Sequence, residues 1–300
     1  MQLSGLHLLV TYQCNFECDH CFVWGSPRQS GAMKLGDIRR ILSQAVALGG
    51  VEWIYFEGGE PFLYYAVMAK AAEEAARQGF KVGVVTNAYW ATDHEDALEW
   101  LNPLAGRVHE LSVSSDLYHS DERLSRQAQA ACAAAQQLDI PVGVISVARC
   151  EAADAPAAVQ PPSGESGVMY RGRAADRLAA QAFQHAWDSF VECPYEDLRD
   201  PGRVHVDPFG AVHVCQGISL GNLFTTSLLE ICSSYDPGSH PVVGPLLEGG
   251  PHQLVRRYDI PHRNTYADAC HMCYEARLAL RGRFPNILVP DQMYGLPEGA

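Results

Sequence analysis

Three cysteines near the start of the chain have the spacing of metal ligands. Cys14, Cys18 and Cys21 follow the apolar run LHLLV (6–10), on the loop that leaves the first predicted strand. Thiolates are soft, anionic ligands, and three of them can hold three corners of a cubane iron–sulfur cluster while the fourth iron stays open to a substrate or cofactor. A structural zinc site is the alternative, with His20 as a fourth ligand.

Three further groups of small or polar residues follow later predicted strands. They lie after the apolar runs VEWIYF (51–56) and FKVGVV (80–85), and at the end of a fourth strand. Glycines let the backbone approach a ligand closely, and a carboxylate can bind a polar or charged group. The residues are Gly58, Gly59 and Glu60, then Asn87, then Ser114 and Asp116.

The cysteine motif, the GGEP segment (58–61) and the two polar strand ends resemble the motifs of the radical S-adenosylmethionine (SAM) superfamily, over roughly residues 6–175. In this family the amino and carboxylate groups of SAM chelate the open iron of a [4Fe-4S] cluster. One electron then cleaves SAM to a 5′-deoxyadenosyl radical, which removes a hydrogen atom from the substrate. The resemblance implies a flavodoxin- or ferredoxin-type electron donor. It also implies SAM binding at Gly58, Gly59, Glu60, Asn87, Ser114 and Asp116.

Two arginines, Arg171 and Arg173, flank Gly172 at the end of a predicted sixth strand. A guanidinium can bind a carboxylate with two parallel hydrogen bonds. Arg173 is therefore a candidate for the carboxylate of SAM or of the substrate. A salt bridge on the rim of the sheet is the alternative.

Short apolar runs alternate with helical patterns through the first half of the chain. This alternation predicts right-handed βαβ units and a parallel sheet. Six units are too few to close an eight-stranded barrel, so the predicted fold class is α/β, a partial six-unit β/α barrel with its chemistry at the carboxyl ends of the strands. Strands are expected at 6–11, 51–57, 80–86, 108–114, 140–147 and 167–171, and helices at 34–48, 63–78, 94–103, 121–138 and 174–186.

The pattern changes after the predicted barrel, which covers residues 1–186. The segment VHVDPFGAVHVC (204–215) predicts a β-hairpin, and a CxxC motif opens a terminal helix. Residues 187–300 resemble the small SPASM/twitch-type domain that binds an auxiliary [4Fe-4S] cluster in part of the superfamily, and one such cluster is expected, for electron transfer. Zinc is the alternative, because a hairpin cysteine with a CxxC motif is also a zinc pattern. The four candidate ligands are Cys193, Cys215, Cys270 and Cys273.

Composition limits the partners of the chain. Its 300 residues carry a formal charge of −13 and no run of more than two basic residues, which argues against a nucleic-acid substrate. No apolar stretch is long enough to span a membrane, and no signal peptide is recognisable. The cysteines cluster in metal-ligand spacings instead of a disulfide framework, so a cytoplasmic location is expected.

The expected reaction is hydrogen abstraction from a small polar metabolite, with oxidation preferred. The resemblance to twitch-bearing alcohol dehydrogenases carries this preference, although fold analogy does not fix a substrate. One alternative is a maturase that cross-links or epimerises a ribosomally made peptide. A second alternative, without catalysis, is an iron–sulfur redox carrier or sensor; the segment 57–61 argues against it, because a carrier does not need a SAM-binding segment.

Overall fold

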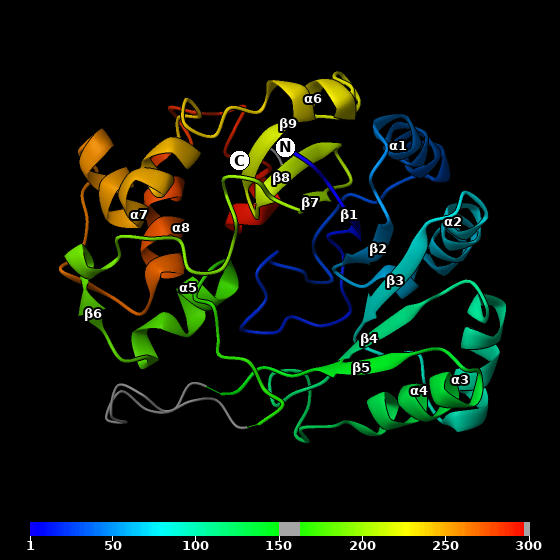
Figure 1. The fold of residues 1–300 in the computed structure, drawn as a ribbon. Coiled ribbons are helices and arrows are strands. Elements are labelled where there is room, and N and C mark those ends of the chain that lie inside the picture. Colours follow the sequence, from blue (N-terminus) through cyan, green and yellow to red (C-terminus); the bar gives the residue numbers. More distant parts are fainter. Residues whose placement is uncertain (150–162, 297–300) are drawn as a thin grey trace.

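An eight-stranded sheet in the order β5-β4-β3-β2-β1-β7-β8-β9 runs through the molecule in the computed structural model (Figure 1). The structure describes residues 1–149 and 163–296, and most of the Pro/Ala-rich segment 150–166, which the sequence predicts as a loop after the fifth strand, lies outside the described residues. The strands of this sheet are β1 (Gly5–Thr11), β2 (Trp53–Gly58), β3 (Lys81–Thr86), β4 (Glu110–Ser114), β5 (Val142–Ile145), β7 (Arg203–Val206), β8 (Ala211–Cys215) and β9 (Ile218–Asn222).

Strands β1 to β5 are parallel neighbours in chain order, which confirms the predicted mostly parallel α/β sheet. Side chains alternate between the two faces of a strand. Leu6, Leu8 and Phe56 are fully buried on the face covered by helices, whereas His7 and Glu57 lie on the opposite, concave face. The covering helices are α1 (Leu35–Leu48), α2 (Tyr65–Arg77), α3 (His94–Leu101) and α4 (Arg126–Gln137).

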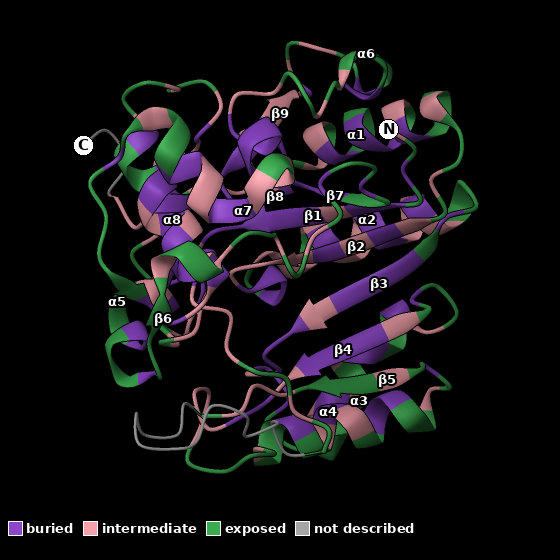
Figure 2. Cartoon of the chain, turned by 60° about the vertical axis from the view of Figure 1, so that its left-hand side comes forward, coloured by how far each residue is buried: buried purple, intermediate pink, exposed green. Residues whose placement is uncertain are grey.

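The sixth strand expected at 167–171 does not form. The described chain beyond β5 makes one isolated bridge, between Val147 and Ser166. Beyond it, the backbone amide of Tyr170 donates to the carboxylate of Asp268, which lies just before a C-terminal helix. This contact draws the segment away from β5. Figure 2 shows β5 as the largely exposed edge of the sheet.

The helix expected at 174–186 is also wrong for most of its length. Helix α5 (Arg173–Arg177) and one short 3₁₀ turn are followed by β6 (His185–Ala186), which pairs with β10 (Thr265–Tyr266). The Ala-rich sequence favours a helix locally, but the tertiary pairing of β6 with β10 overrides that propensity.

The predicted hairpin is confirmed as β7 and β8, which are antiparallel and connected through Gly210 with φ of 85°. Its placement was not foreseen. Strand β7 pairs in parallel with β1, so that the second half of the chain extends the sheet of the first half. A second apolar core then forms from Leu9 of β1 together with the C-terminal helices. These helices are α7 (Val243–Tyr258) and α8 (Ala269–Leu280), whereas the buried residues of α6 (Leu228–Ser234) belong to the same core as Leu6 and Leu8. None of the described helices is long and apolar enough to cross a bilayer.

Candidate cofactor site

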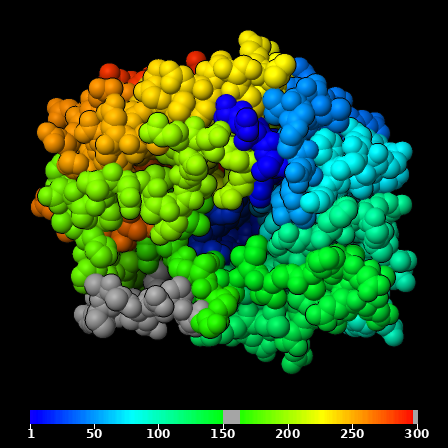
Figure 3. Space-filling model, viewed as in Figure 1, coloured from blue at the N-terminus to red at the C-terminus, as the bar shows by residue number. Residues whose placement is uncertain are grey.

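A cavity of about 300 Å³ lies at the carboxyl ends of β1 to β5. In Figure 3 the dark blue N-terminal residues lie at the bottom of a hollow in the surface. Most of the residues proposed from sequence meet in this cavity. Its walls include Cys14, Cys18, Cys21, Gly58, Gly59, Glu60, Asn87 and Ser114.

The cysteine loop receives hydrogen bonds typical of sulfur ligands. The backbone amides of Phe16 and Gly25 donate to the sulfur atoms of Cys14 (3.4 Å) and Cys21 (3.2 Å), respectively. Burial raises the pKa of the Cys14 thiol to about 12, and burial also raises the pKa of Cys18. Both thiols therefore need a bound cation to become thiolates at neutral pH, because a metal deprotonates a coordinating thiol.

The spacing of the cysteines bears on the zinc alternative. Within residues 1–149 and 163–296, the groups of three or more His, Cys, Asp or Glu ligand atoms that lie within 4.8 Å of one another contain no cysteine. A tetrahedral zinc ion with Zn–S bonds of about 2.3 Å would hold its sulfur ligands about 3.8 Å apart. Neither cysteine group has this compact arrangement, and the wider spacing suits a larger inorganic group such as a four-iron cluster.

Gly58 and Gly59 are required by the protein's own backbone. A Cβ atom on Gly58, whose φ is 136°, would lie 2.5 Å from the carbonyl oxygen of Thr11. A Cβ atom on Gly59 would lie 2.1 Å from the carbonyl oxygen of Gln13. The amide of Gly59 donates to the Thr11 carbonyl at 2.6 Å. The two glycines therefore let β2 close on the loop that carries the cysteines.

The carboxylate of Glu60 is occupied by protein donors. Its two oxygens accept hydrogen bonds from the amide of Phe62 (3.0 Å), the hydroxyl of Thr86 (2.9 Å) and the amide of Asn87 (2.8 Å). Burial raises the pKa of Glu60 to about 7, although these three donors act against the shift. The side chain links the ends of β2 and β3 and lines the cavity, and SAM binding by Glu60 stays a prediction.

Asn87 lies against the cysteine loop. Its Nδ2 donates to Asn15 Oδ1 at 2.9 Å and contacts the sulfur of Cys14 at 3.6 Å. Ser114, at the end of β4, lines the same cavity. Asn87 and Ser114 thus lie at the carboxyl ends of parallel strands, where ligands bind in open α/β sheets.

Asp116 lies outside the cavity wall, and its contact with SAM stays a prediction. It is 1% exposed, and its carboxylate accepts hydrogen bonds from the amides of Tyr118 (2.9 Å) and Val147 (3.2 Å). His119 Nδ1 lies 2.8 Å from it, and His20 Nε2 lies 3.7 Å away. Burial acts to raise the pKa of Asp116, but His119 outweighs it and lowers that pKa. Asp116 thus holds together the ends of β4 and β5.

The two arginines have different positions from those expected. Arg173 is 2% exposed, is not in the cavity wall, and donates to the carbonyl oxygens of Cys18 and Gly25, both at 2.7 Å. It supports the cysteine loop, and a contact with a SAM carboxylate stays a prediction. Arg171 lines the cavity and forms the alternative salt bridge, with Glu196 at 3.2 Å.

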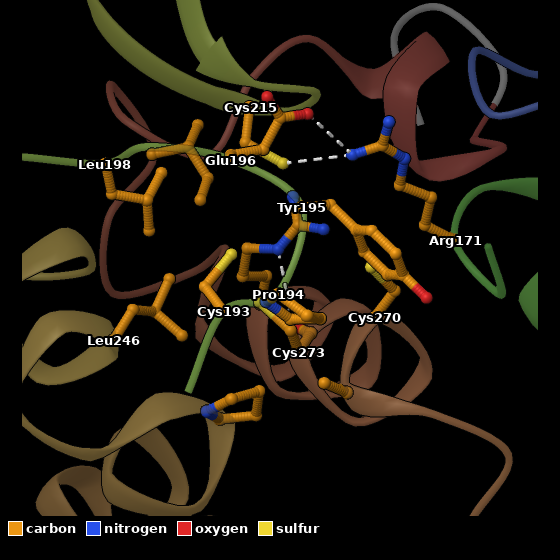
Figure 4. A pocket seen from close by; sticks show the side chains of 14 residues that line it. Arg171, Cys193, Pro194, Tyr195, Glu196, Leu198, Cys215, Leu246, Cys270 and Cys273 are labelled. Atoms are coloured by element: carbon orange, nitrogen blue, oxygen red, sulfur yellow. Dashed lines mark hydrogen bonds and ion pairs between the residues drawn. The ribbon is translucent and has the colours of Figure 1, made fainter. Parts of the chain in front are cut away.

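The four C-terminal cysteines meet in a second, smaller pocket (Figure 4). Cys193 comes from a loop, Cys215 from the end of β8, and Cys270 and Cys273 from the first turns of α8. Burial raises the pKa of Cys193, of Cys270 and, to about 11, of Cys273. Arg171 lines this pocket as well as the first, and its Nη1 lies 3.5 Å from the sulfur of Cys215.

Residues 8–142 match the family model of the radical SAM superfamily. The chain contains a radical SAM domain. The matched region begins in β1 and ends at the start of β5, so it contains the three N-terminal cysteines and the carboxyl ends of β1 to β4.

The radical SAM domain resembles enzymes with different reactions. YydG of Bacillus subtilis, a proposed peptide biosynthesis protein, is 27% identical over 109 residues, which are 36% of this chain and 34% of that protein. A SAM-dependent nucleotide dehydratase of Selenomonas ruminantium is 33% identical over 82 residues, or 27% of this chain and 29% of that protein. The matches span about a third of the length of these relatives.

One solved structure with a similar fold is SuiB of Streptococcus suis bound to SAM. It superimposes with a TM-score of 0.53 and 15% identity, over 85% of this chain and 74% of that chain. At this identity the likeness concerns the fold alone.

Two residues that support the cysteine sites could not be identified from the sequence. Gly25 packs so closely that a Cβ atom would lie 3.3 Å from the Cβ of Cys14. Arg277 is 2% exposed, donates to the carbonyl oxygens of Cys273 and Gln216, and lies beside the second cysteine group. The only sequence signal for Gly25 is its place within a motif loop, and Arg277 lies one helical turn after Cys273.

Proposed function

We propose that the chain is a radical SAM enzyme that abstracts hydrogen from its substrate. The convergence of Cys14, Cys18 and Cys21 with Gly58 and Asn87 on one cavity supports this function most strongly. When bound there, a [4Fe-4S] cluster with an open iron supplies the electron that cleaves SAM. The protein holds the thiolates, buries them and keeps water away from the reacting groups.

The test is SAM cleavage without substrate. The anaerobically reconstituted protein with dithionite should release 5′-deoxyadenosine slowly. Cys18→Ala should abolish this release, because the cluster would lose one of its three ligands. Cys132→Ala, on the outer helix α4, is the matched control and should leave the rate nearly unchanged. Equal rates in the two variants would contradict the proposal.

The second cysteine group is proposed to bind one auxiliary [4Fe-4S] cluster. Four thiolates close the coordination of such a cluster, which suits electron transfer better than substrate binding. No three of the four sulfur atoms lie within 4.8 Å of one another, as a tetrahedral zinc site would require, and this supports iron over zinc. The reconstituted protein should then hold about eight irons, and the variant with Cys14, Cys18 and Cys21 all changed to Ala about four. Zinc without iron in that variant would contradict the auxiliary cluster.

The proposed substrate is a small polar metabolite, which the enzyme oxidises. Polar residues on the concave face of the sheet support this class, because buried polar groups recognise substrates through hydrogen bonds. Those in the wall of the first cavity include Thr86, Ser114 and Ser166.

Peptide modification is the second candidate, favoured by the sequence similarity to YydG, whose name refers to peptide biosynthesis. A metabolite extract can separate the two candidates. A rise in 5′-deoxyadenosine above the substrate-free rate should come from the low-mass fraction if the substrate is a metabolite. A rise that depends on a protease-sensitive fraction would instead support a peptide.

A further inference from the structure

Three side chains from three neighbouring strands meet on the concave face of the sheet. They are His7 on β1, Glu57 on β2 and His205 on β7. His7 and His205 are direct partners across the β1–β7 pair, and Glu57 is paired with Leu9, two residues along β1 on the same face. The group is therefore built on rigid elements, and β7 must join the sheet for it to exist.

The ligand atoms of this group have the separations of a metal site. Glu57 Oε2 lies 3.2 Å from His7 Nδ1, and Glu57 Oε1 lies 3.1 Å from His205 Nε2. The three ligand atoms all lie within 4.8 Å of one another. Bonds of about 2.1 Å that meet at right angles place two ligand atoms about 3 Å apart, which is close to both observed distances.

Hydrogen bonding alone explains this group less well. Charge-assisted N–H···O hydrogen bonds are about 2.7–2.9 Å long. His119 and Asp116 meet that description at 2.8 Å, and backbone amides complete the shell of that aspartate. Glu57 Oε1, in contrast, is buried and lies 3.1 Å from His205 Nε2, close enough for a hydrogen bond but without the alignment of one. A buried carboxylate oxygen with such a contact alone is poorly compensated unless a cation also binds it.

The imidazole of His7 is held in place by an aromatic neighbour. The ring of Tyr55 stacks on His7, with centroids 4.6 Å apart and an interplanar angle of 13°, and fixes its orientation. The side chains of His7, Glu57 and His205 are 18%, 13% and 10% exposed, so the group is accessible from the concave side.

We propose that His7, Glu57 and His205 bind one divalent first-row metal ion, separate from both cysteine sites. Two imidazoles and one carboxylate with open positions form the ligand set that suits Fe²⁺ or Mn²⁺. Glu57 also lines the cavity of the radical SAM domain, so the open positions face that cavity. An oxygen or nitrogen donor of a substrate can complete the coordination there.

The test uses Mn²⁺ as the probe, because this hard ion has little affinity for thiolates. The cluster-loaded protein is freed of loose metal with EDTA and titrated with Mn²⁺, while electron paramagnetic resonance measures the free ion. The wild-type protein should bind one Mn²⁺ per chain. Glu57→Gln and His205→Gln should each weaken binding by about tenfold or more, since even outer-shell partners of a metal contribute that much.

Glu110→Gln is the matched control, because it removes another carboxylate from the concave face of the sheet. It should leave Mn²⁺ affinity unchanged, and the iron content of each variant shows whether the core site is intact. No tight Mn²⁺ binding by the wild-type protein would overturn the proposal. An equal loss of Mn²⁺ affinity in Glu57→Gln and Glu110→Gln would overturn it too, because nonspecific attraction to negative charge would then explain the binding. If Glu57→Gln loses iron through its proximity to Gly58, His205→Gln decides the outcome alone.

Discussion

Arg171 is the residue that joins the two cysteine sites. Its side chain lines both pockets, is 6% exposed, and lies over the ring of Phe22 in the N-terminal cysteine loop. Its Nη1 contacts Cys215, whereas its Nε is buried without a hydrogen-bond partner. A guanidinium at this position places a fixed positive charge next to the second site.

We expect Arg171→Gln to lower the reduction potential of the auxiliary cluster. The reduced cluster carries one more negative charge than the oxidised cluster, and the guanidinium stabilises it preferentially. The shift should be on the order of tens of millivolts in a spectroscopic redox titration. Arg203→Gln is the control, because Arg203 pairs with the same Glu196 at 3.5 Å from an exposed position. Equal shifts in both variants would assign the effect to Glu196 instead.

Asp116→Asn should destabilise the protein in a pH-dependent way. Because the folded-state pKa of Asp116 is depressed, its stabilisation is present above the ordinary aspartate pKa and is lost as the pH falls through the folded-state value. The free energy of unfolding of the variant should be lower by about 1–3 kcal/mol at pH 7, since the amide group of an asparagine cannot accept all the hydrogen bonds that the carboxylate accepts. In thermal melting of the cluster-free protein, the difference in melting temperature between wild type and variant should become smaller below about pH 4. Asp121→Asn, at an exposed position nearby, should melt like the wild type at both pH values.

At the scale of elements, the sequence predicted those strands and helices whose formation depends on residues close together in the chain. Strands β1 to β4 were predictable because their helix-facing residues form apolar runs, and α3 begins at His94 as expected, where Asp93 caps it. Helix α4 begins at Arg126, five residues later than expected, because Ser125 caps it there. The helix predicted at 174–186 was wrong because pairing with β10, about eighty residues further along the chain, overrides the helical propensity of this segment. The pairing of β7 with β1 has no signal in either strand alone.

The residues of the candidate site show the same difference between features set by nearby sequence and features set by distant segments. The cysteines and Gly58 could be predicted from spacing, because a short motif determines where they lie. The positions of Asp116 and Arg173 could not, since both are determined by partners in distant segments: Val147 for the aspartate, and the carbonyls of the cysteine loop for the arginine. The His7–Glu57–His205 group depends on three strands coming together. In the sequence it is visible only as single polar residues within apolar runs.

Gly59→Ala tests the contact between β2 and the cysteine loop. The added Cβ would lie 2.1 Å from the Gln13 carbonyl, so the loop must move and take Cys14 with it. We expect a lower melting temperature and loss of iron at the core site. Gly36→Ala, in α1 with nothing within 4 Å of the added atom, should keep its iron and melt at the same or a slightly higher temperature. Normal iron content in Gly59→Ala would show that the loop tolerates the shift.

At the scale of the whole molecule, the two cysteine sites are proposed to act in sequence. Cys273→Ala should spare SAM cleavage and block the later step, if the auxiliary cluster accepts the second electron of an oxidation. With substrate present, the ratio of 5′-deoxyadenosine to oxidised product should then rise well above one. Circular dichroism must show a folded variant, because cluster binding also stabilises its surroundings. A ratio that stays at one would leave the second site with a structural role.

The parallel pairing of β7 with β1 makes the two halves of the chain poor candidates for exchange as modules. Removing the residues after 186 would strip β1 of a neighbour and expose Leu9, which belongs to the second apolar core. The same cut would free Tyr12, two residues before Cys14, from its hydrogen bond to the buried Asp207 at 3.0 Å. An isolated N-terminal half would therefore present an open sheet edge, the usual starting point of aggregation. A grafted C-terminal half from a relative would succeed only if it restored that edge.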